Sequence, residues 1–444
     1  MILRPILRRT ATAAAFIALF AAIPQADAPR APQRQPSGRV VVIGDIHGSI
    51  DGLTGILRTA GLADGRVWTG GNATLVQTGD YTDRGTAVRA VMDLLMALEP
   101  QAAAAGGRVQ VLLGNHEVMN LVGETRDVTP AIFATFAGDK SEARHEEAWR
   151  EYEKFFAARA ARLGAAAVKP QAREAWMTAH PPGFLEYREA FGPEGTYGKW
   201  LRRLPVVAQI DGSIMMHAGI HPDTAPDSIE DINKQVAREL RNFDDYSRHL
   251  VSRGVILPFF TLQEIFDAVQ AEAQAITAAQ TAAKNGESAS LAQSQILSDV
   301  DRKHIEVLQG IARFGTWSLL NPNGPLWFRG YATWPSPGNA PEVTKLLKKY
   351  HAKRFVTGHT VPSTMRITPR FDRRIFLIDT GMLSTYYKGG RASALEIDGD
   401  RVTAIYQDGR VQLDPESAQP ENDEFRMPNA ERPMPNAEGL AVNR

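Results

Sequence analysis

The 444-residue chain carries 50 Lys and Arg against 50 Asp and Glu, so its zero net charge predicts no nucleic-acid groove or anionic-membrane surface. It contains no cysteine, which excludes disulfides, thiolate metal sites and a cysteine nucleophile. Its apolar fraction of 43% and charged fraction of 23% are ordinary for globular proteins. We therefore expect most of the chain to fold, and we favour one elaborated domain over two or three.

The N-terminal segment has the pattern of a secretory signal peptide. Residues 1–28 combine early arginines with an apolar stretch over residues 11–23 and end in a small-residue Ala-x-Ala site. This apolar stretch is shorter than the roughly 20 residues that span a bilayer, which favours a signal over an uncleaved anchor. Pro29 keeps the anchor as an alternative, because proline hinders cleavage there. We expect a periplasmic or secreted protein without a transmembrane segment in the mature chain, and a linker over residues 29–38.

Short apolar runs alternate with amphipathic stretches over residues 39–413, a pattern that is typical of βαβ units. We expect strands at Val40–Ile43, Thr74–Gln77, Val109–Leu113, Ile214–Met216, Arg354–Val356 and Ile375–Ile378. The predicted fold class is therefore α/β, in one domain over residues 39–413.

Two long segments, residues 129–200 and 226–312, interrupt this alternation and are predicted to be helical insertions. Aromatic and aliphatic residues recur in both at helical spacing, and we interpret these stripes as packing faces rather than ligand sites. In the second segment, Thr261 and Glu264 form a capping box. Residues 414–444 are rich in Pro, Glu and Asn and repeat the sequence MPNAE, so we predict a disordered tail.

Five predicted strands end in the same way, with glycine beside an Asp, Asn or His. The motifs are GDIHG with Asp45 and His47, GDYTDRG with Asp80, GNHE with Asn115, HAG with His217, and GHT with His359. Because the carboxyl ends of parallel strands lie along one edge of an open sheet, we expect these six side chains to converge. One such motif alone is more typical of a turn, so the prediction depends on their joint occurrence.

The composition of this group indicates which metals it would bind. Two carboxylates, three imidazoles and one amide oxygen suit Mn, Fe or Zn, whereas Ca and Mg favour shells made only of oxygen. Six ligands exceed what one tetrahedral site uses. We therefore expect two divalent ions about 3.5–4 Å apart that share a carboxylate, an arrangement known from in-line displacement at phosphorus.

Together, these five motifs resemble those of the calcineurin-like metallophosphoesterase superfamily, in its phosphoprotein-phosphatase branch, over roughly residues 40–407. The resemblance implies a β-sandwich flanked by helices. Thr82, Leu113 and the HAG motif depart from the commonest pattern of the branch. With the secretory start and the sequence GPLWFRGY at 324–331, these departures look like the bacterial Shewanella-like phosphatases.

The resemblance also implies a role for each ligand. Asp45 and His47 would hold the first ion, and Asp80 would bridge to the second. The second ion would be held by Asn115, His217 and His359.

The same resemblance implies the catalytic groups. His116 would be the general acid, with Asp83 orienting its ring; the alternative is that His116 only caps the following helix. Arg84, Arg329 and Asn115 would bind the phosphate. For Arg329, the alternative is a stacked or ion-paired surface arginine. His221 in HAGIHPD is either an outer support of the site or a loop histidine.

The leading hypothesis is a metal-dependent phosphomonoesterase of the protein-phosphatase type, in which a metal-bridged hydroxide attacks phosphorus. Its partner would be a phosphorylated protein, a peptide or a small phosphoester. The alternatives are a hydrolase of nucleotides or dinucleoside polyphosphates, and an inactive metal-binding docking protein. Both phosphotyrosine and phosphoserine or phosphothreonine remain open as substrates, and Trp327, Phe328 and Tyr331 are candidates for contact with an aromatic leaving group.

Overall fold

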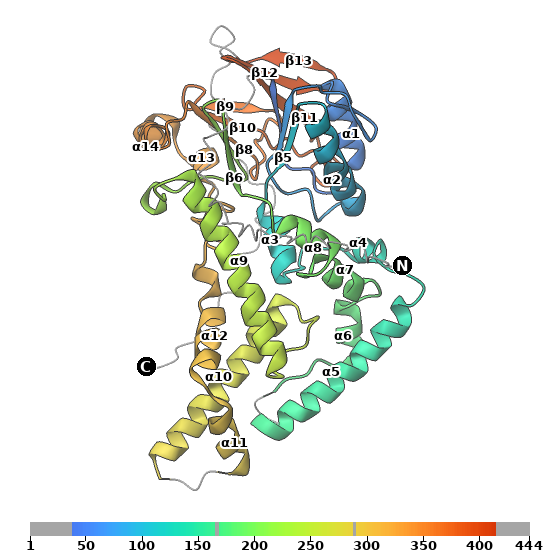
Figure 1. Cartoon of the computed structure of the whole chain (residues 1–444), viewed down its shortest axis with the longest axis vertical. Coiled ribbons are helices and arrows are strands. Elements are labelled where there is room, and N and C mark those ends of the chain that lie inside the picture. The colour runs from blue at the N-terminus through green and yellow to red at the C-terminus, as the bar shows by residue number, and fades with distance from the viewer. Residues whose placement is uncertain (1–37, 165–167, 287–289, 414–444) are drawn as a thin grey trace, which may run out of the picture. The chain divides into compact units, whose positions relative to one another are not determined.

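The computed structural model describes residues 38–164, 168–286 and 290–413 (Figure 1). The predicted signal peptide, the predicted tail and nearly all of the predicted linker lie outside the described residues. Within the described ranges, no helix is both long enough and apolar enough to cross a membrane. Two large β-sheets, with helices around and between their strands, make up this part of the chain.

The first sheet has six strands in the order β13-β12-β11-β1-β4-β5. Its strands are β1 (Val40–Ile43), β4 (Thr74–Gln77), β5 (Arg108–Val111), β11 (Ser393–Asp398), β12 (Arg401–Tyr406) and β13 (Gly409–Gln412). β1, β4 and β5 pair in parallel, with Val41 opposite Leu75 and Val76 opposite Gln110. The carboxyl ends of these three strands therefore lie along one edge of the sheet.

The second sheet has five strands in the order β6-β7-β8-β10-β9. They are β6 (Val207–Ile210), β7 (Ser213–Met216), β8 (Arg354–Thr357), β9 (Thr368–Arg370) and β10 (Ile375–Leu377), and a separate pair is formed by β2 (Ala63–Asp64) and β3 (Val67–Trp68). β7, β8 and β10 are parallel, with Ile214 and Ile375 on either side of Phe355. Their carboxyl ends share an edge as well.

All six predicted strands form, and the predicted α/β class is confirmed. Alternation along β1 shows how the sheets are layered. Val40 and Val42 belong to a buried cluster that also contains Met215, Val356 and Phe376 of the second sheet. Val41 and Ile43 belong instead to the larger cluster that contains the apolar faces of the helices. The two sheets thus pack face to face with helices on the outside, as the resemblance implied.

Helices α1 (Ile50–Thr59) and α2 (Val88–Ala104) pack on the outer face of the first sheet (Figure 1). The chain between β5 and β6 forms α3 (Asn115–Val122), α4 (Pro130–Ala134), α5 (Ser141–Leu163), α6 (Arg173–Ala179), α7 (Phe184–Phe191) and α8 (Thr196–Leu201). The predicted insertion at 129–200 thus contains helices α4 to α8. Trp149 and Tyr152 of α5 are buried among other aromatic rings, which confirms the predicted packing face.

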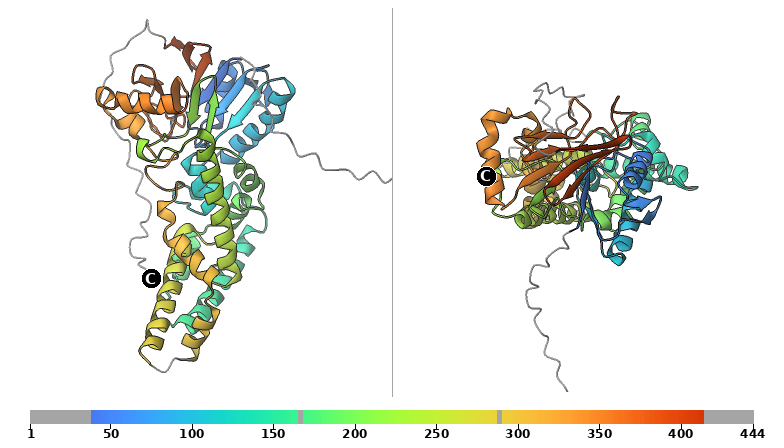
Figure 2. Two further views of the ribbon diagram at one scale, coloured as in Figure 1. Left: turned by 60° about the vertical axis from the view of Figure 1, so that its left-hand side comes forward. Right: turned by 90° about the horizontal axis from the view of Figure 1, so that it is seen from above.

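The chain between β7 and β8 forms a second set of helices. They are η2 (Pro222–Thr224), α9 (Ile229–Ser252), α10 (Leu262–Lys284), α11 (Leu291–Asp299), α12 (Arg302–Ala312), η3 (Phe314–Thr316), α13 (Gly330–Thr333) and α14 (Ser336–Lys349). α10 packs against α11 and α12, and α12 packs against α9 (Figure 2). The predicted capping box at the start of α10 is present, because Thr261 Oγ1 accepts from the main-chain N–H of Glu264 and the Glu264 carboxylate accepts from that of Thr261.

Candidate metal centre

The four residues predicted to hold the second ion lie together. His217, which follows β7, directs Nε2 towards Asn115 Oδ1 at 2.7 Å and His359 Nδ1 at 3.0 Å. The same nitrogen lies 3.3 Å from Asp80 Oδ2, beyond the end of β4. Asn115 follows β5 and His359 follows β8, so both sheets contribute to this buried group.

The residues predicted to hold the first ion adjoin this group through Asp80. His47 Nε2 lies 3.7 Å from Asp80 Oδ2 and 3.9 Å from Asp45 Oδ2. His47 Nδ1 is 2.9 Å from the carbonyl oxygen of Thr82, which leaves Nε2 as the acceptor nitrogen. Burial, together with the positive charge of Arg84, holds the pKa of His47 well below its ordinary value. The ring is therefore neutral, as a metal ligand must be.

Two buried carboxylates of the site, Asp45 and Asp379, lack matching positive charge. Burial and the neighbouring Asp379 raise the pKa of Asp45 well above its ordinary value, and burial raises the pKa of Asp379 to about 6. Asp379 follows β10, and its Oδ2 accepts no hydrogen bond from any described donor. Divalent cations would neutralise these groups, and imidazoles, carboxylates and an amide oxygen are the donors that Mn, Fe and Zn accept. The residues therefore fit two such ions.

The predicted catalytic residues lie beside this group. His116 Nδ1 is 2.7 Å from Asp83 Oδ2, and His116 Nε2 is 3.1 Å from Arg84 Nη2. Arg84 Nη1 in turn lies 2.6 Å from His47 Nε2 and donates to the hydroxyl of Tyr387. Nε2 of His116 is also 3.7 Å from Asp80 Oδ2, so His47, Asp80 and His116 form a second possible ligand group.

The backbone is strained at this point. His47, Asp80, Asp83, Arg84 and His359 all have φ between 46° and 66°, a region that side-chain-bearing residues rarely adopt. Such conformations persist only where the surrounding structure enforces them, and they concentrate at functional sites. In this chain they occur in the loops that follow β1, β4 and β8, and they turn these loops so that His47, Asp80 and His359 reach the common centre.

Glu117 was not predicted as a site residue, yet it organises the loop that carries Asp80. Its carboxylate accepts hydrogen bonds from the main-chain N–H groups of Asp80, Tyr81, Thr82 and Gly114, at 2.7 to 3.0 Å. The Thr82 hydroxyl adds a fifth hydrogen bond at 2.8 Å. One buried carboxylate thus ties the end of β4 to the end of β5.

Replacing Glu117 with glutamine is expected to lower the free energy of unfolding by roughly 2–6 kcal/mol, because each buried N–H without an acceptor costs about 1–3 kcal/mol. The amide nitrogen of glutamine cannot accept, so at least two main-chain donors lose their partner. Urea unfolding followed by circular dichroism measures the change. Glu153→Gln on the exposed face of α5 is the matched control, and equal stability of the two variants would contradict the organising role.

Residues 38–253 match the family model of calcineurin-like phosphoesterases. The matched segment contains β1, β4, β5 and β7, and therefore every ligand candidate described above except His359 and Asp379. Over this segment, which is just under half of the 444 residues, the chain is a calcineurin-like metallophosphoesterase.

This metallophosphoesterase is a distant homologue of the Shewanella-like protein phosphatases. It is 25% identical to Shewanella-like protein phosphatase 1 of Plasmodium berghei (strain Anka) over 378 residues, which cover 83% of this chain and 74% of the relative. It is 41% identical to Shewanella-like protein phosphatase 2 of Arabidopsis thaliana over 92 residues, or 20% of this chain and 24% of the relative. The crystal structure of a cold-active protein-tyrosine phosphatase of a psychrophilic Shewanella species superposes with a TM-score of 0.48 at 21% identity, covering 85% and 80% of the two chains.

Arg329 and His221, the other two predicted site residues of the metallophosphoesterase, make different contacts. Arg329 Nη1 donates to the carbonyl oxygen of His359 at 2.9 Å and to Thr360 Oγ1 at 3.0 Å, so it supports the loop of a ligand. His221 accepts from the main-chain N–H of Asp223 and has its ring beside Phe328. This arrangement matches the loop-histidine interpretation of His221.

The prediction that Phe328 and Tyr331 contact an aromatic leaving group is wrong. Both rings are buried in the core, and the Tyr331 hydroxyl accepts from the main-chain N–H of Ile220. Tyrosines that the sequence did not single out lie beside Arg84 instead. Tyr387 accepts its hydrogen bond, and the guanidinium carbon is 4.9 Å from the ring centre of Tyr386, which is 51% exposed.

Glycines let the ligand-bearing loops of the metallophosphoesterase approach one another. A Cβ atom on Gly358 would lie 2.2 Å from Asp45 Oδ1, and one on Gly114 would lie 2.1 Å from Asp80 Oδ1. Gly79 has φ of 102°, and a Cβ there would lie 2.3 Å from the main-chain nitrogen of Gly114. A side chain at any of these positions would displace a carboxylate or separate two strand ends.

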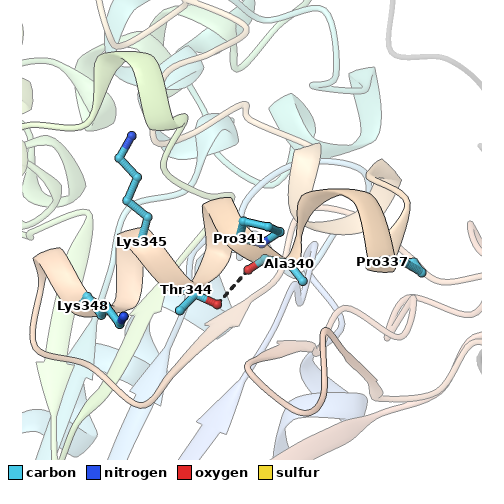
Figure 3. A pocket seen from close by; sticks show the side chains of 6 residues that line it. All are labelled: Pro337, Ala340, Pro341, Thr344, Lys345 and Lys348. Carbon is cyan, nitrogen blue, oxygen red and sulfur yellow. Dashed lines mark hydrogen bonds between the residues drawn. The ribbon is translucent and has the colours of Figure 1, made fainter.

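A surface hollow on α14 is lined by residues other than those described above. Figure 3 shows that one helix supplies its lining, which comprises Pro337, Ala340, Pro341, Thr344, Lys345 and Lys348. The Thr344 hydroxyl is occupied by a hydrogen bond to the carbonyl oxygen of Ala340. No ligand candidate lines this hollow, and we assign it no role.

Proposed function

We propose that this metallophosphoesterase is a phosphomonoesterase of the protein-phosphatase type that uses two divalent metal ions. The observation that carries the proposal is the place of Asp80 between two buried ligand groups, with Arg84 and His116 beside it. A metal centre that adjoins a guanidinium and an imidazole combines charge stabilisation with proton donation, which phosphoester hydrolysis requires. The distant homology to protein phosphatases supports this class of substrate.

We assign Asp45 and His47 to the first ion and Asp80 to both. Asn115, His217 and His359 would complete the set for the second ion, and Mn, Fe and Zn all suit these donors. When bound, the ions supply Lewis acidity that polarises the phosphate and lowers the pKa of a water molecule.

Arg84 is the proposed phosphate-binding group. Its two terminal nitrogens face His47 and His116, so the guanidinium adjoins both the first ligand group and the proposed general acid. A guanidinium can donate two parallel hydrogen bonds to phosphate oxygens and stabilise their charge. The amide of Asn115 and the guanidinium of Arg329 are proposed as further contacts of the phosphate.

His116 is proposed to donate the proton that the leaving oxygen needs. Asp83 accepts from Nδ1 and so fixes the ring, which directs Nε2 towards Arg84. Burial raises the pKa of Asp83 from its ordinary value, although hydrogen bonds from His116 and Asn120 oppose this effect. A carboxylate paired with an imidazole in this way favours the protonated ring that a general acid requires.

An aromatic phosphoester such as phosphotyrosine is the preferred substrate in this proposal. Tyr386 is half exposed next to Arg84 and offers a ring face to a flat leaving group. It replaces Phe328 and Tyr331 in this role, whereas Trp327, the third residue assigned to it from the sequence, is only partly buried and stays a candidate.

The test combines elemental analysis of the purified protein with initial rates on a phosphotyrosine peptide, a phosphoserine peptide and a dinucleoside tetraphosphate. We expect two divalent ions per chain and faster hydrolysis of the phosphotyrosine peptide. Equal rates on the two peptides would remove the aromatic preference. Preferential cleavage of the tetraphosphate would replace the proposal with a nucleotide hydrolase, and two bound ions without turnover would indicate a docking protein.

We also propose export to the periplasm or secretion, on the pattern of residues 1–28. Fractionation of a bacterial host that expresses the full chain tests this directly. We expect the activity outside the cytoplasm, with residues 1–28 removed, and retention in the cytoplasm would contradict it. A variant that lacks residues 1–28 is the control and should stay in the cytoplasm.

A further inference from the structure

A chain of hydrogen bonds runs from helix α7 to the ring of His116. The Tyr187 hydroxyl donates to Asn120 Oδ1 at 2.6 Å, and Asn120 Nδ2 donates to Asp83 Oδ1 at 2.8 Å. The other oxygen of Asp83 lies 2.7 Å from His116 Nδ1. All four side chains are at most 1% exposed, so water does not compete for these bonds.

The amide of Asn120 can satisfy its partners in one orientation only. Its nitrogen donates to Asp83 and to the carbonyl oxygen of His116, at 2.8 and 2.9 Å, and both of these partners are acceptors. A flipped amide would turn its oxygen towards the Asp83 carboxylate. The hydroxyl of Tyr187 supports the observed orientation by donating to Oδ1, and burial raises the pKa of Tyr187, so this proton is retained.

Helix α7 donates hydrogen bonds to the backbone carbonyl of Asn120 as well as to the Asn120 side chain. Arg188 Nη1 donates to the carbonyl oxygen of Asn120 at 3.2 Å, one residue along from Tyr187. The Tyr187 ring packs against Phe133, Phe136 and Phe191, with centroid distances of 4.5 to 5.2 Å. The hydroxyl is therefore presented from a rigid aromatic cluster within the first helical insertion.

We propose that Tyr187 is a positioning residue for proton donation, acting through Asn120 and Asp83 on His116. By this route the first helical insertion takes part in the reaction and does more than cover the site. The inference rests on the proposed function, because it requires His116 to be the general acid.

The test is Tyr187→Phe, which removes one oxygen and keeps the ring. We expect unchanged metal content and KM, and a fall in kcat of about 10-fold on an alkyl phosphoester such as a phosphoserine peptide, within the range seen for residues that orient a functional group. On nitrophenyl phosphate, whose leaving group needs little protonation, we expect a change of less than about twofold. Tyr197→Phe is the matched control, because its buried hydroxyl donates to Asp93 and not to this chain of hydrogen bonds.

A second comparison keeps the test decisive if Tyr187→Phe loses stability. In a His116→Asn background, Tyr187→Phe should cause no further fall in kcat on the alkyl substrate. Equal losses on both substrates, or a further loss in that background, would overturn the inference while the proposed function stands. A wild-type protein that hydrolyses no phosphoester would refute the proposed function, and the inference with it.

Discussion

Asp80→Asn is expected to abolish metal binding and turnover together. The carboxylate of Asp80 lies 3.3 to 3.7 Å from ring nitrogens of His47, His116 and His217, so it is the group that joins both ligand sets. Although burial opposes ionisation, the neighbouring histidines hold the pKa of Asp80 well below its ordinary value, so the residue carries the negative charge that a bridging ligand supplies. An asparagine amide has no charge to share between two cations.

We expect this substitution to lower kcat by at least about 10³-fold, since metal ions contribute several kcal/mol to stabilising the transition state and 1.4 kcal/mol is tenfold. Elemental analysis after dialysis gives the metal content, and initial rates on nitrophenyl phosphate give the activity. Asp64→Asn, at an exposed carboxylate on β2, is the control and should change neither. Two ions retained in Asp80→Asn would show that Asp80 does not bridge.

His116→Asn is expected to leave the metal content intact and to lower kcat by about 10²–10⁴-fold on alkyl phosphoesters. The effect should be smaller on nitrophenyl phosphate, because its leaving group departs without a proton. Full activity on a poor leaving group would refute the assignment as general acid. Loss of metal would instead identify His116 as a ligand, in the group with His47 and Asp80. His221→Asn is the control, and it should retain both metal and rate.

The sequence was sufficient to predict that the six candidate side chains lie together, because parallel strands converge at their carboxyl ends. An apolar run that stops at glycine and a polar residue can be read locally, and the topology then brings five such ends together. Asp379 follows β10 in the same way, within FLIDTG, so the signal for it was present and was overlooked. Strands β11 and β12, of six residues each, were not predicted, because polar residues interrupt their apolar runs, as Glu396 does in β11 and Thr403 in β12.

The remaining site residues could not be predicted, because their partners are distant in the sequence. Glu117 gathers N–H groups up to 37 positions away, and Tyr187 lies 67 positions from Asn120. Glu117 lies in the GNHE motif, but the motif does not show which N–H groups its carboxylate accepts from, and the sequence around Tyr187 resembles any other helix position. The wrong prediction for Phe328 and Tyr331 has a similar cause. The sequence shows that the rings are present, but it does not show whether they point into the core or towards the site.

The division of the ligands between the two sheets has a thermodynamic consequence. Asp80 and Asn115 follow strands of the first sheet, and His217 and His359 follow strands of the second. A cation held by all four would therefore cross-link the two sheets. A ligand that binds only the folded state stabilises it by RT ln(1 + [L]/Kd), so the unfolding midpoint should rise with free metal concentration. The concentration of free metal would then set the conformational stability of the protein as well as its turnover rate.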